Sequence, residues 1–181
     1  YLHPVDLRPR QCALSAIVTA ALEFLAPEFA TRDITARTRL APALPELKLD
    51  PELLTQVVTS LVRFAARHLP EGGQVEIASS RHARFAHLDV LFASALAVRE
   101  PDLLFLPFQE GDERMGLPLS YRIVKNMGGA LTFSQIGREA AFTVQLPLGP
   151  LTEPLPPFED EDEGEDAGDE TAALPGPGQA S

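Results

Sequence analysis

The sequence of 181 residues has one cysteine and no tryptophan. The single cysteine, Cys12, excludes an internal disulfide and a cysteine-rich metal site, and it fits the reducing cytoplasm where we expect this protein to work. We expect Cys12 to be a small apolar residue of a helix rather than a reactive thiol. The sequence also lacks an unbroken run of about 18 apolar residues and a visible signal peptide, so it predicts no membrane span and no direct membrane contact.

Basic residues are absent from the last part of the chain. Residues 151–181 hold ten acidic residues and no Lys or Arg, whereas residues 1–150 hold 16 acidic and all 15 basic residues. The body is therefore near neutral and gives no general signal for nucleic-acid binding. Residues 150–181 have too few apolar side chains to offset the entropy of ordering, so we expect a disordered acidic tail that is dispensable for folding. Such a tail either solvates the protein or competes for a basic surface.

Apolar residues at helical spacing predict three helices in the body of the chain. Asp50 can cap the second helix and Pro51 suits its first position, while Gly128 ends the third. The expected helices cover about residues 14–25, ending before Pro27, then residues from 50 to before Pro70, and residues 117–127.

Alternating apolar and polar residues predict strands between and after these helices. The expected strands lie within residues 31–40, 75–77, 85–90, 131–133 and 142–146, the last two forming a hairpin around Gly137. Strands that pair beside amphipathic helices favour an α+β fold. We therefore expect a two-layer sandwich over residues 1–149, in which a mixed sheet is backed by about three helices.

Four segments, in this order and at these spacings, resemble the motifs of the GHKL ATPase superfamily in its histidine-kinase form. They are DPELLTQVVTSLVRFAARHLPEGGQVEI (50–77), similar to the asparagine box, PDLLFLPFQEGDE (101–113), similar to the phenylalanine box and lid, GLPLSYRIVKNMGGALTF (116–133), similar to the last glycine box, and FTVQLPL (142–148), similar to the closing strand. The resemblance implies a sheet backed by three helices, with ATP and magnesium between helix and lid. It also implies upstream phosphoacceptor helices, absent from this chain, through which the protein could dimerise.

The positions that hold nucleotide in that family carry other residue types here. The asparagine box binds magnesium through an Asn side chain, and its aligned positions here are Ser60 and Phe64. A phenylalanine offers no oxygen to the cation. In the first glycine box, the adenine-binding aspartate aligns with Leu91, which cannot accept a hydrogen bond, and two glycines align with Ala93 and Ala95. We expect Phe64 and Leu91 to fill the vacant pocket with apolar side chains.

The second glycine box is also incomplete. Its Gly-x-Gly-x-Gly pattern aligns with residues 112–116, where only Gly116 remains and Arg114 stands at a glycine position. Asp112 and Glu113 would repel a triphosphate, and Pro118 removes one amide donor from the start of the following helix. We expect the lid between residues 108 and 116 to be a short, tight connection.

The packing residues of the family pattern are retained while the pocket residues are not. They are Leu104, Phe105, Phe108, Leu117, Leu119 and Ile123. We therefore expect a non-catalytic pseudokinase domain of a two-component sensor histidine kinase-like protein, which binds no ATP, magnesium or other metal. It would act in signal transduction by binding a response regulator or a partner kinase. Two alternatives stay open: an ATP-dependent protein-histidine kinase with an atypical pocket, and the response-regulator-docking half of a histidine phosphotransferase.

Four arginines of the body, Arg63, Arg67, Arg81 and Arg84, have two interpretations. They are either a solvated face or a clustered docking patch, the latter suited to an acidic partner such as the tail of this same chain.

Overall fold

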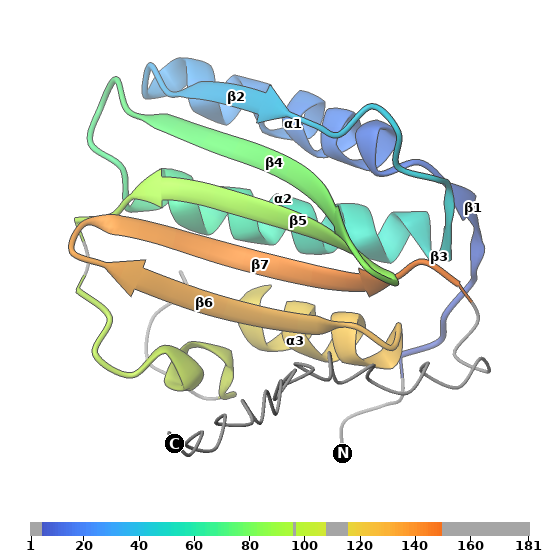
Figure 1. The fold of residues 1–181 in the computed structure, drawn as a ribbon. Helices are drawn as coiled ribbons and strands as arrows, with labels where there is room; N and C mark the ends of the chain where they lie inside the picture. The colour runs from blue at the N-terminus through green and yellow to red at the C-terminus, as the bar shows by residue number, and fades with distance from the viewer. Residues whose placement is uncertain (1–4, 96, 108–115, 150–181) are drawn as a thin grey trace, which may run out of the picture.

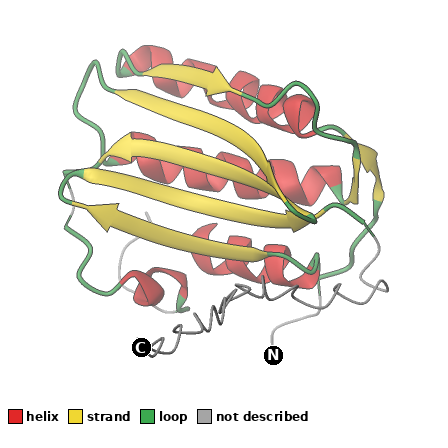
Figure 2. Ribbon diagram, in the orientation of Figure 1, coloured by secondary structure: helices red, strands yellow, loops and turns green. Residues whose placement is uncertain are grey.

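The structure, a computed structural model, describes residues 5–95, 97–107 and 116–149, and these form a mixed sheet with three helices on one face (Figure 1). The elements are β1 (Arg10–Cys12), α1 (Leu14–Thr31), β2 (Thr35–Arg39), β3 (Leu47–Leu49), α2 (Pro51–Arg67), β4 (Gln74–His82), β5 (Phe85–Ala93), the 3-10 helix η1 (Pro101–Phe105), α3 (Gly116–Asn126), β6 (Ala130–Ile136) and β7 (Glu139–Pro147). The predicted α+β sandwich is confirmed, and Figure 2 shows the helices gathered behind the five-stranded sheet.

The strand order of the main sheet is β2-β4-β5-β7-β6. The β2–β4 pair is parallel and the other three pairs are antiparallel, so the sheet is mixed as expected. The hairpin between β6 and β7 turns at Gly137, whose φ of 61° is the left-handed conformation that glycine adopts at low cost. The face of the sheet that carries no helix is called the open face below.

Burial along β5 follows the two-residue period of a strand with one covered face. Ala86, Leu88, Val90 and Phe92 are all buried in the core that the sheet shares with the helices. The residues between them are half-buried and belong to the open face. Every second side chain of β5 is therefore buried, and the position of the apolar residues in the sequence decides which ones.

Helix α2 begins as its sequence predicts. The Asp50 carboxylate accepts hydrogen bonds from the amides of Glu52 at 3.1 Å and Leu53 at 3.0 Å, and Pro51 occupies the first turn. A third amide, that of Arg8, donates to the same carboxylate at 2.7 Å. Asp50 thus caps the helix and also ties it to the segment that precedes β1.

Helix α1 is longer than predicted, because it continues through Pro27 to Thr31. Pro27 is exposed, so the carbonyl that loses its amide partner can be solvated. Beyond the proline, Phe29 is buried and Thr31 donates its hydroxyl to the Pro27 carbonyl at 3.0 Å. Burial of Phe29 offsets the cost of about 3 kcal/mol that an interior proline imposes on a helix.

The apolar composition of α1 also meets the length and hydropathy of a membrane-crossing helix, with a mean hydropathy of 1.3, although Glu23 and Glu28 interrupt its apolar run. A core helix meets the same criteria, so this property is weak evidence for a span. In the structure α1 packs against the core through Leu14, Ile17, Val18, Ala21, Leu25 and Phe29, all buried. This packing accounts for the apolar residues on the buried face of α1, whereas Phe24 on its other face is exposed.

A second, two-stranded sheet of β1 and β3 was not predicted. Each strand has three residues, too few for a periodic signal. Cys12 lies in β1, so its predicted place in a helix is wrong, and its thiol donates to the carbonyl of Leu47 at 3.5 Å. Burial raises the pKa of the Cys12 thiol, which disfavours the reactive thiolate.

Candidate nucleotide-side site

Helices α2 and α3 approach each other closely at Ser60 and Gly116, two positions singled out from the sequence. A Cβ atom on Gly116 would lie 2.8 Å from the Ser60 hydroxyl oxygen and 3.0 Å from the Ser60 Cβ. The 2.8 Å carbon–oxygen distance is shorter than Cβ atoms show in proteins, and the 3.0 Å carbon–carbon distance is tighter than most of their contacts. The Ser120 hydroxyl donates to the Gly116 carbonyl at 2.6 Å and, at 1% exposure, is sealed in the same junction. The start of α3 therefore rests directly on α2.

Phe64 lies one helical turn beyond Ser60 and is fully within the core, with 2% of its surface exposed. Its ring meets the Phe142 ring edge-on at 5.4 Å and the His68 ring at 4.4 Å. The expectation that Phe64 fills this region with an apolar side chain agrees with its burial.

Phe142 of β7 is the centre of an aromatic cluster on the helix side of the sheet. It contacts rings from α2, β5, η1 and β6 at centroid distances of 5.4, 6.0, 6.3 and 5.0 Å. We call this set the phenylalanine cluster; it consists of Phe64, Phe92, Phe105, Phe133 and Phe142. Stacked and edge-on rings of this kind are worth about 0.5–1.5 kcal/mol per pair beyond their buried area.

Leu91 does not fill the pocket, so that prediction is wrong. Leu91 is a half-buried residue of the open face, whereas its neighbour Phe92 is 5% exposed and stacks on Phe142. The physical reason is strand alternation, since a residue out of phase with Val90 must point away from the helices. Phe92 is the buried position that the sequence reasoning missed, although it is in phase with the buried Leu88 and Val90 along β5.

Ala93 is the last residue of β5 and Ala95 lies two residues beyond it, and both are exposed. Ala93 pairs with Glu139 of β7 at the end of the ladder. The Ala95 amide donates to the carbonyl of His68 at 3.2 Å, so this segment is tied to the end of α2. Arg114, the lid between residues 108 and 116, and the tail lie outside the described residues.

Four of the six retained packing residues are buried as predicted, namely Leu104, Phe105, Leu117 and Ile123. Leu119 is 38% exposed, so its predicted place in the core is wrong, and Phe108 lies outside the described residues. Leu103 and Leu106, in and beside η1, are also exposed, at 38% and 47%. Helix η1 packs on α3 through the stacked rings of Phe105 and Tyr121, whose centroids are 5.4 Å apart. The exposed leucines therefore lie on two elements that contact each other.

The four arginines do not form one cluster. Arg63 and Arg67 lie in the last two turns of α2, near the start of β4, whereas Arg81 and Arg84 lie at or beyond the end of this nine-residue strand (Figure 1). At about 3.3 Å per residue, the strand separates the two pairs by roughly 25 Å. Arg63 is also paired with Glu28 at 3.1 Å and lies over the Phe24 ring.

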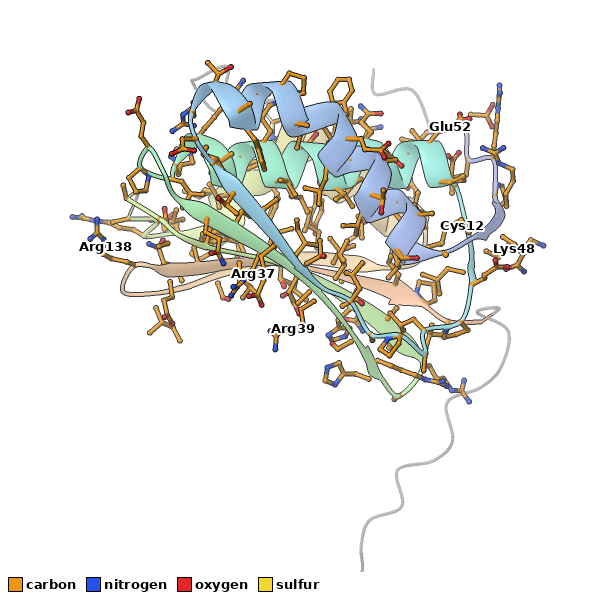
Figure 3. The ribbon with its side chains drawn as sticks, turned by 90° about the horizontal axis from the view of Figure 1, so that it is seen from above. Cys12, Arg37, Arg39, Lys48, Glu52 and Arg138 are labelled. Atoms are coloured by element: carbon orange, nitrogen blue, oxygen red, sulfur yellow. The ribbon has the colours of Figure 1, made fainter. Side chains whose placement is uncertain are left out.

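The open face carries a separate hollow of about 200 Å³, lined by Arg39, Ala78, Ser79, Ser80 and Asp89. Figure 3 shows Arg39 on the side of the sheet opposite the helices, where it pairs with Glu76 at 2.9 Å. Asp89 accepts a hydrogen bond from the Thr143 hydroxyl at 2.7 Å. This hollow is therefore distinct from the helix side, where the resemblance places the nucleotide.

Comparison with known proteins agrees with this geometry. Residues 49–150 match the family described as histidine kinase-, DNA gyrase B- and HSP90-like ATPase. The chain is 26% identical over 151 residues to the sensor histidine kinase ZraS of Escherichia coli (strain K12), a match that covers 80% of this chain and 32% of that protein. The chain thus spans about a third of the length of this relative.

Two solved structures share the fold. Histidine kinase ThkA in complex with response regulator protein TrrA has a TM-score of 0.72 and 17% identity, over 81% of this chain and 44% of that one. Full-length ShkA in complex with AMPPNP has a TM-score of 0.69 and 20% identity, over 80% of this chain and 32% of that one. Together with the match over residues 49–150, the fold shows that the chain belongs to the histidine kinase-, DNA gyrase B- and HSP90-like ATPase family and carries its histidine kinase-type ATPase domain.

Proposed function

We propose that this domain does not bind ATP and acts as a non-catalytic module of a cytoplasmic two-component sensor protein, through contacts with other proteins. The observation that carries the proposal is the phenylalanine cluster. Phe64 and Phe92 occupy the helix side of the fold, and Phe64 stands where the resemblance expects a magnesium-binding asparagine. Neither side chain offers an oxygen to a cation or a hydrogen-bond acceptor to adenine.

The combined loss of contacts is large compared with the affinity of a nucleotide site. Each buried polar contact removed costs about 1–3 kcal/mol. Loss of the adenine acceptor, the magnesium ligand and the phosphate donors together costs about 4–8 kcal/mol, which lowers affinity by about 10³–10⁶-fold. A micromolar site weakened by this amount would have a dissociation constant of about 1 mM to 1 M, so it would be at most about half occupied at about 1 mM ATP.

The retained glycine does not argue for phosphate binding. A Cβ atom on residue 116 would lie 2.8 Å from the Ser60 hydroxyl oxygen, so Ser60 would have to shift to admit a side chain there. The close junction of α2 and α3 therefore supports a role for Gly116 in helix packing. Domain packing has been kept while the groups that bind nucleotide have been replaced.

Protein binding is supported by the exposed apolar side chains of η1 and α3. Leu103, Leu106 and Leu119 are 38%, 47% and 38% exposed, although the elements that carry them are packed together. Exposed apolar side chains gathered in one region are typical of protein contact surfaces. The ThkA–TrrA complex shows that a protein with this fold binds a response regulator. By analogy, we propose a response regulator or a partner kinase as the partner of this chain.

Titration calorimetry with Mg-ATP tests the nucleotide part of the proposal. The protein, titrated to millimolar Mg-ATP, should release no heat of binding. Full-length ShkA, which has been seen with AMPPNP, is the positive control under the same conditions. A dissociation constant in the micromolar range for this chain would overturn the proposal and favour an ATP-dependent kinase with an atypical pocket.

A further inference from the structure

The turn between β4 and β5 is rich in basic residues. Residues 81–87 contain Arg81, His82, Arg84 and His87 and no acidic residue. Arg81 and His82 are exposed, and Arg84 and His87 are half-buried. We call this set the basic hairpin.

The geometry of the basic hairpin holds its positive groups together. The His82 and His87 rings face each other across the two strands with centroids 4.5 Å apart, and His82 also contacts the Ser80 hydroxyl at 3.1 Å. The acid of the open face nearest along β5 is Asp89, two residues beyond His87 and held by Thr143. No ion pair of Arg81 with an acid occurs within the described residues.

The last described residues of the chain lie beside this same hairpin. Pro147 at the end of β7 pairs with Phe85, and the Leu148 amide donates to the Arg84 carbonyl at 2.7 Å. The acidic block of residues 159–170 starts eleven residues after Leu148. A spacer of this length reaches at most about 36–40 Å, which easily covers the seven residues of the hairpin. The acidic block is thus tethered beside the basic hairpin at a high effective concentration.

We propose that the acidic segment 159–170 binds the basic hairpin of the same chain. The alternative basic pair, Arg63 and Arg67, fits less well. Arg63 is already paired with Glu28, and both residues lie at the opposite end of β4 from the point where the tail begins. Individual exposed ion pairs are weak, so the interaction depends on many acidic groups near a few positive ones and weakens with salt.

Amide NMR on the full chain tests the proposal with three variants. The first changes every Glu and Asp of residues 151–181 to Gln and Asn, the second is Arg81→Glu, and the third, Arg67→Glu, is a matched control at an exposed arginine. Neutralising the tail should shift the resonances of residues 81–87, and Arg81→Glu should shift those of the tail. Arg67→Glu should leave the tail resonances unchanged. In about 1 M salt, where the Debye length is about 3 Å, the wild type should resemble the neutralised variant around the hairpin.

Three results would overturn the proposal: unchanged hairpin resonances on neutralisation, shifts centred instead on the end of α2, or shifts that persist in about 1 M salt. A spin label gives an independent readout. The label is attached at position 163 in the double variant Cys12→Ala, Glu163→Cys. At low salt it should broaden the amide resonances of residues 81–87 more than those of residues 67–74. Equal broadening of both segments would contradict a specific contact with the hairpin.

Discussion

Gly116 and Ser60 are in contact across the junction of α3 and α2, with the serine hydroxyl 2.8 Å from where a Cβ of residue 116 would lie. The relationship explains a glycine that a sequence comparison assigns to phosphate binding. One glycine can serve both a family motif and the packing of two helices. At the first position of α3, glycine is favoured by the close approach of Ser60.

Gly116→Ala should lower the free energy of unfolding by about 1–3 kcal/mol, as expected when a methyl group is forced into a packed junction. Ser60→Gly removes both close contacts, and alone it should cost about 1 kcal/mol because it places glycine inside a helix. The double variant should be more stable than the sum of the two effects predicts, by about 0.5–3 kcal/mol. Urea denaturation of the four proteins measures this coupling, and strict additivity would show that the two residues do not meet.

Phe64→Leu and Phe64→Asn compare an apolar and a polar side chain of similar size at the same buried site. Both leave part of the phenylalanine volume empty, so both should destabilise the fold. Phe64→Asn should cost about 1–3 kcal/mol more than Phe64→Leu, because it buries an amide among aromatic rings. Thermal unfolding of the pair measures this difference. Neither variant should bind Mg-ATP, and a gain of binding in Phe64→Asn would mean that the rest of the pocket is intact.

Features of the fold that depend on neighbouring residues in the sequence could be predicted well. Asp50 followed by Pro51 marks the start of α2, and the alternation of Leu88 and Val90 with polar residues marks β5, because both signals are local consequences of backbone geometry. The fold class followed from these elements taken in order. The helix through Pro27 was missed because burial of Phe29, a tertiary effect, outweighs the local cost of proline.

The candidate site could be predicted only in part, because its contacts join residues far apart in the chain. Aligning motifs without gaps placed Leu91 in the pocket, although the phase of β5 assigns that place to Phe92. The contact of Ser60 with Gly116 depends on the packing of two helices and has no signature in a single sequence. The separation of Arg63 from Arg81 likewise depends on the direction of β4.

The assignment of Leu91 to the open face and Phe92 to the core predicts opposite outcomes for two adjacent substitutions. Leu91→Ser should change the free energy of unfolding by about 1 kcal/mol or less, since the side chain lies on the half-exposed face. Phe92→Ser should cost about 3–5 kcal/mol, because it empties part of the phenylalanine cluster and buries a hydroxyl. Chemical denaturation measures both values, and a larger effect at Leu91 than at Phe92 would reverse the assignment of the two faces.

Asp50 links acid stability to the start of α2. Burial of its carboxyl group raises the pKa, but hydrogen bonds from the amides of Leu53, Arg8 and Glu52 together outweigh burial, and the pKa is lowered below its usual value. A carboxyl group whose pKa is lower in the folded than in the unfolded protein stabilises the fold when it is ionised. That stabilisation is complete above the unfolded pKa of about 3.9 and is lost as pH falls through the folded pKa.

Asp50→Asn keeps an oxygen that can cap α2 but removes the charge that the three amides stabilise. At neutral pH it should therefore lower the free energy of unfolding, and Asp50→Ala, which also removes the cap, should lower it further, by about 1–2 kcal/mol in total. As pH falls from about 4 through the lower pKa of the folded protein, the stabilisation by the charge is lost and the gap between wild type and Asp50→Asn should narrow. Urea denaturation of the three proteins between neutral and acid pH measures the gap. A gap that stays constant down to the lowest pH at which the protein folds would mean that the charge of Asp50 contributes nothing, and that the carboxylate acts only as a hydrogen-bond acceptor.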